Sequence, residues 1–134
     1  MDTLLQYPPA SQPFNLGGDL TVNRLGYGAM RLTGQPGNFG PYADWDGGKA
    51  LLRRAVELGI NFIDTAEAYG PGDNEAIIAD ALHPYSANLV IATKGGIHKP
   101  SLDNIQANGS PEYLRRGVEG SLRRLKRDYI DLYQ

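Results

Sequence analysis

The sequence has no cysteine, only two histidines and no long apolar run. The absence of cysteine excludes a disulfide, a zinc–thiolate site and a cysteine nucleophile. His83 and His98 have no acidic cluster beside them, so no metal site is predicted. No stretch approaches the roughly 18 apolar residues of a membrane span, and the N-terminus lacks the apolar core of a signal peptide. We therefore expect no membrane association and a cytoplasmic location.

The net charge is also small, because acidic and basic residues nearly balance. Lys and Arg number 13 against 15 Asp and Glu, which gives a net charge of -2 and a pI near 5.6. This balance gives no reason to expect a nucleic-acid partner. The exception is a basic run of Arg115, Arg116, Arg123, Arg124, Lys126 and Arg127. We interpret this run as a solvated helix face rather than a nucleic-acid surface, because Glu119 interrupts it and its apolar stripe is needed for packing.

The chain divides into a short N-terminal segment and one domain. Residues 1–13 contain Pro8, Pro9 and Pro13 and are predicted to be flexible, whereas 14–134 form the domain. Residues 14–16 and 20–22 predict a β-hairpin around two glycines. Strands are then expected at 24–30, 60–64, 89–94 and from 129, and helices from Asp44 or Asp46, at 74–82 and from Ser110, with loops at 33–42 and from Gly95 to Ser110. This alternation predicts an α/β fold with a parallel sheet.

The predicted helices carry apolar stripes and end signals. Ser110-Pro111-Glu112 combines an N-cap residue, a proline at the first helical position and an acid in the first turn. Gly59 follows the first helix, where a left-handed residue commonly ends a helix. The expected packing stripes are Leu51, Leu52, Ala55, Val56 and Leu58; then Ile77, Ile78, Ala81 and Leu82; then Leu114, Val118, Leu122 and Leu125.

Three polar residues lie where the chemistry of a parallel sheet collects. Asp64 ends the second of these strands, Lys94 ends the third, and Tyr69 lies in the loop after the second. In a parallel barrel all strand C-termini meet at one face, which holds the active site. Taken singly, each residue is more often a solvated or turn-capping side chain. Their common placement predicts that they converge.

A phenol, an ammonium and a carboxylate form a coherent chemical set. A tyrosine can donate a proton to a carbonyl oxygen that becomes an alkoxide, but its ordinary pKa of about 10 makes it a slow donor near neutrality. An ammonium ~4 Å away attracts the phenolate by about 4 kcal/mol at an effective dielectric of ~20, before desolvation is subtracted. A carboxylate can hold that ammonium charged and aimed. Asp64, Tyr69 and Lys94 fit these three roles.

Four segments of the sequence resemble aldo-keto reductases: Arg24 to Met30, Gly59 to Glu75 (GINFIDTAEAYGPGDNE), Ile91 to Lys94 and Arg127 to Gln134. The central segment is highly specific to that family. The resemblance covers nearly all of the chain after Phe14. It implies the first half of a (β/α)8 TIM barrel that has an N-terminal hairpin and is truncated at the fourth strand, since a full barrel needs about 250 residues.

The resemblance also implies site residues. The family uses Asp, Tyr, Lys and His, and Asp64, Tyr69 and Lys94 match the first three by motif. The His normally follows a Tyr-Gln pair like the one at which this chain stops, and neither His83 nor His98 replaces it by motif. The family binds NADPH without a Rossmann fold, and Gly28, Ala29, Met30 and Asp64 are expected at the nicotinamide end.

The implied function is NADPH-dependent reduction of a small carbonyl substrate. Gly26 to Met30, then Phe-Gly-Pro, and His83 to Ser86 are most similar to the pyridoxal-reductase-type branch, with a general aldehyde or sugar reductase as the alternative. The isolated chain is expected to be impaired. A half-barrel that exposes several hundred Å2 of apolar surface forfeits on the order of 10 kcal/mol, against a typical stability of about 5–15 kcal/mol. A non-catalytic half-barrel that associates with itself or a complementing partner is therefore the alternative function.

Overall fold

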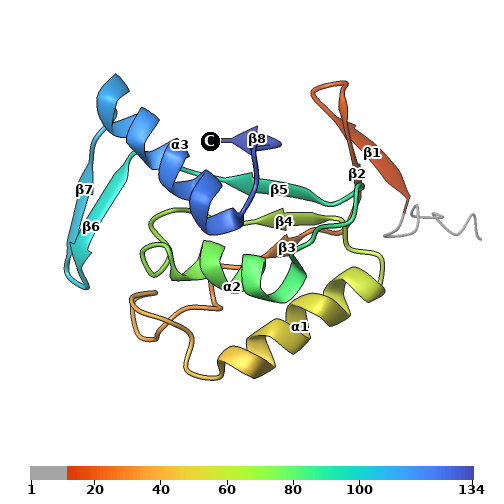
Figure 1. Cartoon of the computed structure of the whole chain (residues 1–134), viewed down its shortest axis with the longest axis horizontal. Helices are drawn as coiled ribbons and strands as arrows, with labels where there is room; N and C mark the ends of the chain where they lie inside the picture. Colours follow the sequence, from red (N-terminus) through yellow and green to blue (C-terminus); the bar gives the residue numbers. More distant parts are fainter. Residues whose placement is uncertain (1–11) are drawn as a thin grey trace, which may run out of the picture.

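The structure, a computed structural model, describes residues 12–134, and residues 1–11 of the predicted flexible segment lie outside the described residues. Its helices are α1 (Trp45–Glu57), α2 (Asp73–Leu82) and α3 (Pro111–Leu125). Its strands are β1 (Pro13–Leu16), β2 (Leu20–Asn23), β3 (Tyr27–Gly28), β4 (Phe62–Asp64), β5 (Val90–Thr93), β6 (Ile97–Ser101), β7 (Asn104–Ala107) and β8 (Leu132–Tyr133). The order of helices and strands matches the predicted alternation, with one added hairpin (Figure 1).

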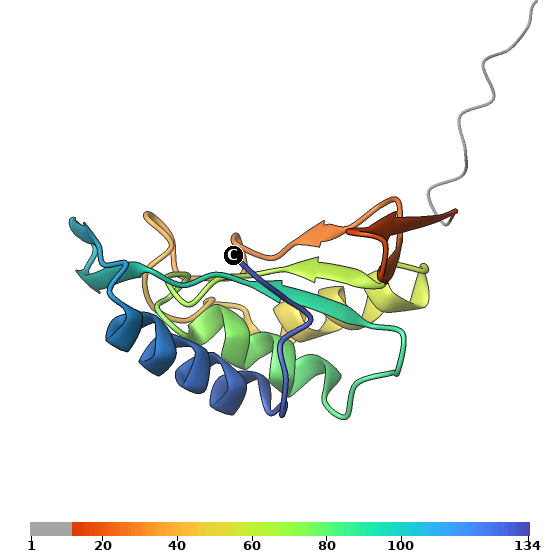
Figure 2. The same ribbon diagram turned by 90° about the horizontal axis from the view of Figure 1, so that it is seen from above.

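The central sheet has four parallel strands in the order β3-β4-β5-β8. Gly28 pairs with Asp64 and Asp64 pairs with Ala92, so the ends of the first three strands stay in register. Figure 2 shows that α1, α2 and α3 all lie on one face of this sheet. No helix among residues 12–134 covers the opposite face. The predicted α/β fold with a parallel sheet is confirmed.

The N-terminal hairpin closes one end of the sheet. β1 and β2 pair antiparallel, with Phe14 opposite Val22, and the two turn glycines have φ of 60° and 90°, which favour glycine. Asn23 at the end of β2 donates its backbone N–H to Asn61 Oδ1 at 2.7 Å. Its side chain donates to the Gly59 carbonyl at 2.5 Å. The hairpin is thereby fixed to the residues that lead into β4, at the N-terminal end of the parallel strands.

The core lies between the sheet and its three helices. All four residues of β5 are buried. The buried cluster also includes Leu52 of α1, Ile77 and Ile78 of α2 and Leu125 of α3. The predicted stripe of α2 is therefore confirmed in its central residues. In α1 the prediction was too broad, because Leu51 is 47% and Leu58 66% exposed.

The packed face of α3 differs from the predicted one. The buried residues of this helix are Gly117, Gly120, Ser121 and Leu125. At Gly117 the missing Cβ leaves room for Glu67 Oε2 and the Tyr133 hydroxyl, which would lie 3.0 and 3.4 Å from an added Cβ. The remaining stripe of Leu114, Val118 and Leu122 is only half-buried, and its first two residues line a pocket with Tyr133 of β8. The stripe was correctly placed on one side of the helix, but most of it does not reach the core.

The predicted end signals of α1 and α3 are confirmed. Asp44 caps α1 by accepting from the Gly47 backbone N–H at 3.0 Å. Gly59 follows with φ of 96°. Ser110 caps α3 by accepting from the Tyr113 backbone N–H at 3.3 Å, with Pro111 at the first helical position. Within residues 12–134, no helix is both long enough and apolar enough to cross a bilayer.

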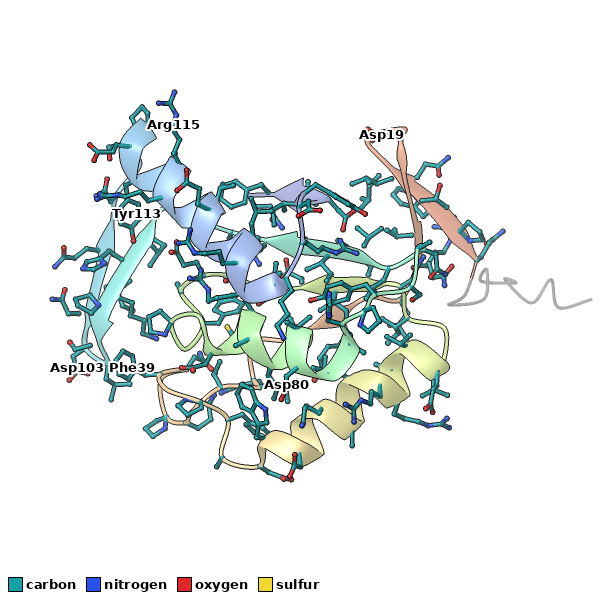
Figure 3. The ribbon with its side chains drawn as sticks, in the orientation of Figure 1. Asp19, Phe39, Asp80, Asp103, Tyr113 and Arg115 are labelled. Carbon is teal, nitrogen blue, oxygen red and sulfur yellow. The ribbon has the colours of Figure 1, made fainter. Side chains whose placement is uncertain are left out.

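A second hairpin, β6–β7, lies where the sequence predicted a loop. Its residues are exposed apart from Lys99, so no burial pattern marked it in the sequence, and its register shifts between His98 and Ser101. Lys99 donates to the carbonyls of Gly37 at 2.5 Å and Asn38 at 3.1 Å. Figure 3 labels Phe39 and Asp103 on these two segments, at the end of the sheet opposite the β1–β2 hairpin with Asp19. The hairpin therefore fixes the 33–42 loop beside the C-terminal ends of the strands.

Candidate active site

Asp64 and Lys94 form an ion pair across the ends of two neighbouring strands. Lys94 Nζ lies 2.7 Å from Asp64 Oδ1 and 2.6 Å from Oδ2. It also donates to the Thr65 carbonyl at 2.9 Å. The three donor positions of the ammonium are therefore matched by three acceptors. The side chains keep 31% and 37% of their surface exposed, so the pair faces open space at the end of the sheet rather than the core.

Tyr69 lies over the same ammonium. Lys94 Nζ is 5.3 Å from the centroid of the Tyr69 ring, within the range of a cation–π contact. Tyr69 is half-buried, in the loop between β4 and α2. The structure therefore brings together all three polar residues predicted to converge. They meet at the C-terminal end of the parallel strands, as parallel-barrel geometry requires.

The backbone continues the parallel pairing beyond the formal strand ends. Thr65 donates its N–H to the Ala92 carbonyl at 2.9 Å, and Glu67 donates to the Lys94 carbonyl at 3.1 Å. Asp64 therefore lies on a segment that pairs with β5 up to Asp64 and with the end of β5 and Lys94 after it. This explains why a carboxylate and an amine separated by thirty residues in sequence lie within hydrogen-bond distance.

Gln134 is a site residue that the sequence reasoning missed. Its side-chain amide donates to Asp64 Oδ1 at 3.2 Å. Its backbone carbonyl accepts from Gly95 at 3.0 Å and its N–H donates to Thr93 at 2.9 Å, which extends the β5–β8 pairing to the site. A usable signal was present, because Gln134 directly follows a strand whose C-terminal end belongs at the same face.

The segment proposed for the nicotinamide end lies next to Asp64. Ala29 donates its N–H to the Asp64 carbonyl at 2.9 Å, and Gly28 pairs with Asp64 across the strands. Gly28 is exposed, and a Cβ added there would meet no atom within 4 Å. Met30 is 38% exposed, whereas Ala29 is fully buried. Gly28 and Met30 thus present an open surface, while Ala29 supports that surface from behind.

A second polar cluster lies under α3, beside the site. Glu67 Oε2 and the Tyr133 hydroxyl are buried and have no hydrogen-bond partner among the residues that the structure describes. Both face Gly117, because a Cβ added there would lie 3.0 Å from Glu67 Oε2 and 3.4 Å from the hydroxyl. Burial raises the pKa of Glu67 above its usual value, against the opposing effect of Arg124. Burial and the neighbouring Glu67 carboxyl likewise raise the pKa of Tyr133.

Neither histidine contacts the Asp64–Lys94 pair through any hydrogen bond in the described part of the chain. His83 packs edge-on against Tyr85 at 5.6 Å, and His98 against Tyr113 at 6.2 Å. Among residues 12–134, no group of three His, Cys, Asp or Glu side chains is arranged to hold a metal.

The basic run of α3 is partly turned inward. Arg124 Nε lies 2.6 Å from Glu75 Oε2. Arg127 pairs with Asp131 and also donates to the Leu89 carbonyl at 3.0 Å. Two of the six basic residues therefore neutralise buried or half-buried acids, which weakens the run as a surface for a polyanion.

Residues 24–134 match the Aldo/keto reductase family, which is most of the chain and includes the whole site. The chain belongs to the aldo/keto reductase family. The resemblance seen in the sequence is thereby confirmed. The parallel sheet and the N-terminal hairpin follow the barrel fold of this family.

Two relatives illustrate the similarity within the family. The chain is 44% identical to pyridoxine 4-dehydrogenase of Escherichia coli over 92% of its own length and 42% of that protein. It is 46% identical to an oxidoreductase of Schizosaccharomyces pombe over 87% of its length and 38% of that protein. The chain thus spans about two fifths of the length of these aldo/keto reductase relatives.

Solved aldo/keto reductases share the fold. The holo form of AKR11C1 from Bacillus halodurans is 35% identical, with a TM-score of 0.79 over 92% of this chain and 39% of that one. An aldo-keto reductase from Klebsiella pneumoniae in complex with NADPH is 26% identical, with a TM-score of 0.63 over 84% of this chain and 34% of that one. The fold is therefore that of part of an aldo/keto reductase barrel, and structures in this family bind NADPH.

Proposed function

We propose that this chain supplies the carboxylate, phenol and ammonium of an NADPH-dependent carbonyl reductase. The observation that carries the proposal is the contact of Lys94 Nζ with both Asp64 oxygens and with the face of Tyr69. An ion pair whose open side carries a tyrosine, at the C-terminal end of parallel strands, is suited to donate a proton to a substrate oxygen.

Each residue has a distinct part in the proposed reaction. Tyr69 donates its phenolic proton to the carbonyl oxygen as that oxygen gains charge, and the proton is later replaced from water. Lys94 stabilises the charge left on the phenol, since its ammonium faces the ring. Asp64 pairs with the ammonium and fixes its direction through two short hydrogen bonds.

Residues of this chain fit the nicotinamide end of NADPH. The open surface at Gly28 leaves room for a flat ring to approach the backbone, and Met30 offers an exposed apolar side chain beside it. Gly28, Ala29, Met30 and Asp64 would hold that end, with Ala29 as the buried support. When bound, NADPH supplies a hydride to the carbonyl carbon, which completes the reduction to an alcohol together with the proton from Tyr69.

We further propose a pyridoxal-type aldehyde as the substrate. The support is the 44% identity to a pyridoxine 4-dehydrogenase over nearly the whole chain, together with the sequence features of 26–30 and 83–86. A small aliphatic aldehyde or a sugar is the competing substrate class.

The experiment measures NADPH oxidation with pyridoxal and with a panel of aldehydes and sugars. It uses the chain alone and a fusion in which the chain replaces the matching part of the E. coli relative. We expect activity in the fusion and a higher kcat/KM for pyridoxal than for the rest of the panel. A fusion that folds, binds NADPH and reduces no carbonyl would refute the proposed activity. A preference for sugars would refute only the substrate.

A non-catalytic half-barrel is the second candidate function. It is favoured by the sheet itself, whose outer strands β3 and β8 each pair on one side only among residues 12–134 and whose second face carries no helix there. Such a module would associate with another copy or with a complementing half. Mixing the chain with a separately produced C-terminal half separates the two functions, since only the reductase gains carbonyl reduction on mixing.

A further inference from the structure

Two neighbouring residues at the start of α2, Asn74 and Glu75, are both polar and both fully buried. A buried polar side chain is costly unless its hydrogen bonds are made, and a buried carboxylate more so. Neither side chain caps its own helix. The N-cap residue is Gly72, and the side chains of Asn74 and Glu75 reach away from α2 to Thr65 and Thr93. Their partners show where that cost is offset.

The side-chain amide of Asn74 makes hydrogen bonds through both its oxygen and its nitrogen. Its Oδ1 accepts from Thr65 Oγ1 at 2.7 Å, and Thr65 is the residue after Asp64. Its Nδ2 donates to the carbonyls of Ala29 at 2.7 Å and Leu32 at 3.0 Å. Its backbone N–H donates to the Tyr69 carbonyl at 3.1 Å. One residue therefore ties together the neighbour of the carboxylate, the nicotinamide segment and the tyrosine.

Glu75 makes the matching contact to the next strand. Its Oε1 accepts from Thr93 Oγ1 at 2.6 Å, and Thr93 is the residue before Lys94. Its Oε2 accepts from Arg124 Nε at 2.6 Å, which offsets the buried charge and connects α3 to the same point. Packing of α3 against α2 alone would not require the bond to Thr93, since an apolar pair fills such a space at lower cost.

We propose that Asn74 and Glu75 are positioning residues that set the spacing of Asp64, Lys94 and Tyr69. Adjacent on one rigid helical turn, they hold the two threonines that flank the ion pair, Thr65 on β4's extension and Thr93 on β5. The spacing matters because catalytic groups must be held to about 0.5 Å, and a displacement of ~1 Å can cost about 10²-fold in rate. The effect of this positioning on the reaction rate rests on the proposed function, whereas the positioning of the three residues does not.

The test follows the Lys94 ammonium by NMR in the full chain with isotope-labelled lysine. Three acceptors around Nζ predict slow exchange of its protons with water and an observable ammonium signal. Thr93→Val keeps the shape of the side chain and removes the hydroxyl donor, whereas Thr93→Ser keeps the donor. Thr65→Val and Thr65→Ser form the equivalent pair at the Asn74 contact.

Tyr85→Phe is the stability-matched control. It removes the hydrogen bond from the Tyr85 hydroxyl to the Leu125 carbonyl at 2.6 Å, which joins other elements. We expect each valine variant to speed exchange of the Lys94 protons by about fivefold, the effect of losing one hydrogen bond of average net strength on local opening. The serine variants and Tyr85→Phe should exchange as the parent chain does.

Three results would overturn the inference: valine variants with parental exchange, equal acceleration by Tyr85→Phe, or no slowly exchanging Lys94 signal in the parent chain. If Glu75→Gln or Asn74→Ala fails to fold, the threonine pairs still decide the matter. The fusion separates this inference from the proposed function. Altered Lys94 exchange in variants of a fusion that reduces no carbonyl would support the positioning role and refute the reductase.

Discussion

Lys94 Nζ contacts both carboxylate oxygens of Asp64, at 2.7 and 2.6 Å, and so bridges the ends of two adjacent parallel strands. The same ammonium faces the Tyr69 ring. A chain that spans about two fifths of its relatives thus already contains an assembled group of three candidate catalytic residues.

The Asp64 carboxylate is expected to act through Lys94. Asp64→Asn in the fusion removes the charge that holds the ammonium, so we expect kcat for carbonyl reduction to fall by on the order of 10²-fold. Asp46→Asn is the matched control, because Asp46 also pairs with a lysine, Lys49 at 3.2 Å, but is 94% exposed. Steady-state kinetics of both variants check this. Equal rates for the two variants would argue against a role for the Asp64 charge.

Glu67 should make stability depend on pH. Burial raises the pKa of this carboxyl above its ordinary value of 4.5 in spite of Arg124, with Glu75 and His98 as further neighbours. The folded state therefore binds the proton more tightly than the unfolded state. The resulting stability is present at low pH and is lost as pH rises above about 4.5 and through the folded pKa.

Glu67→Gln removes this titration. Its free energy of unfolding should fall less than that of the parent chain between acidic and neutral pH, and urea melts across that range measure the difference. Glu57→Gln is the control, since Glu57 is an exposed acid whose one ion pair within residues 12–134 is with Arg54. If the free energies of unfolding of the parent chain and of Glu67→Gln change in parallel with pH, burial does not raise the pKa of this carboxyl.

The Ser110 cap is expected to stabilise α3. Its side chain accepts from the Tyr113 N–H at 3.3 Å, and replacing such a cap by alanine typically costs about 1 kcal/mol. Ser110→Ala should lower the free energy of unfolding by that amount. Ser86→Ala, at an exposed serine in a turn, should change it little. A neutral Ser110→Ala would mean that the first turn of α3 is held by packing alone.

The open sheet predicts association of the isolated chain. The outer strands β3 and β8 are free on one side within the described residues, and the stripe of Leu114, Val118 and Leu122 is only half-buried. Free strand edges and apolar surface favour pairing with other chains. Gel filtration and thermal melts should show a species larger than a monomer or a poorly cooperative melt. A monomer with a sharp melt would contradict this expectation.

The strand-end residues of the site could be predicted from sequence because their position follows from the fold class. Once β4 and β5 are recognised as parallel neighbours, Asp64 and Lys94 must lie at the same end of the sheet. The partners of Asn74 and Glu75 could not be predicted in this way. The side chain of Asn74 reaches the segments that follow β3 and β4, and that of Glu75 reaches β5 and α3. Nothing local to α2 indicates which distant group accepts or donates.

The β6–β7 hairpin and the packed face of α3 could not be predicted from the pattern of apolar residues. The hairpin leaves all but Lys99 of its strand residues exposed, so alternation of buried and exposed positions never arises. Apart from Leu125, the buried residues of α3 are Gly117, Gly120 and Ser121, which carry no apolar signal. Sequence patterns indicate where apolar side chains are buried. The hairpin instead pairs exposed strands, and α3 buries small residues.

The most direct measurement of the central claim is carbonyl reduction by the fusion that carries Tyr69→Phe. The phenylalanine keeps the ring over Lys94 and removes only the proton donor. We predict a fall in kcat of about 10²–10⁴-fold, the usual contribution of a positioned acid, with Tyr113→Phe, on α3, retaining the parental rate. A Tyr69→Phe fusion that reduces pyridoxal and simple aldehydes at the parental rate would contradict the account.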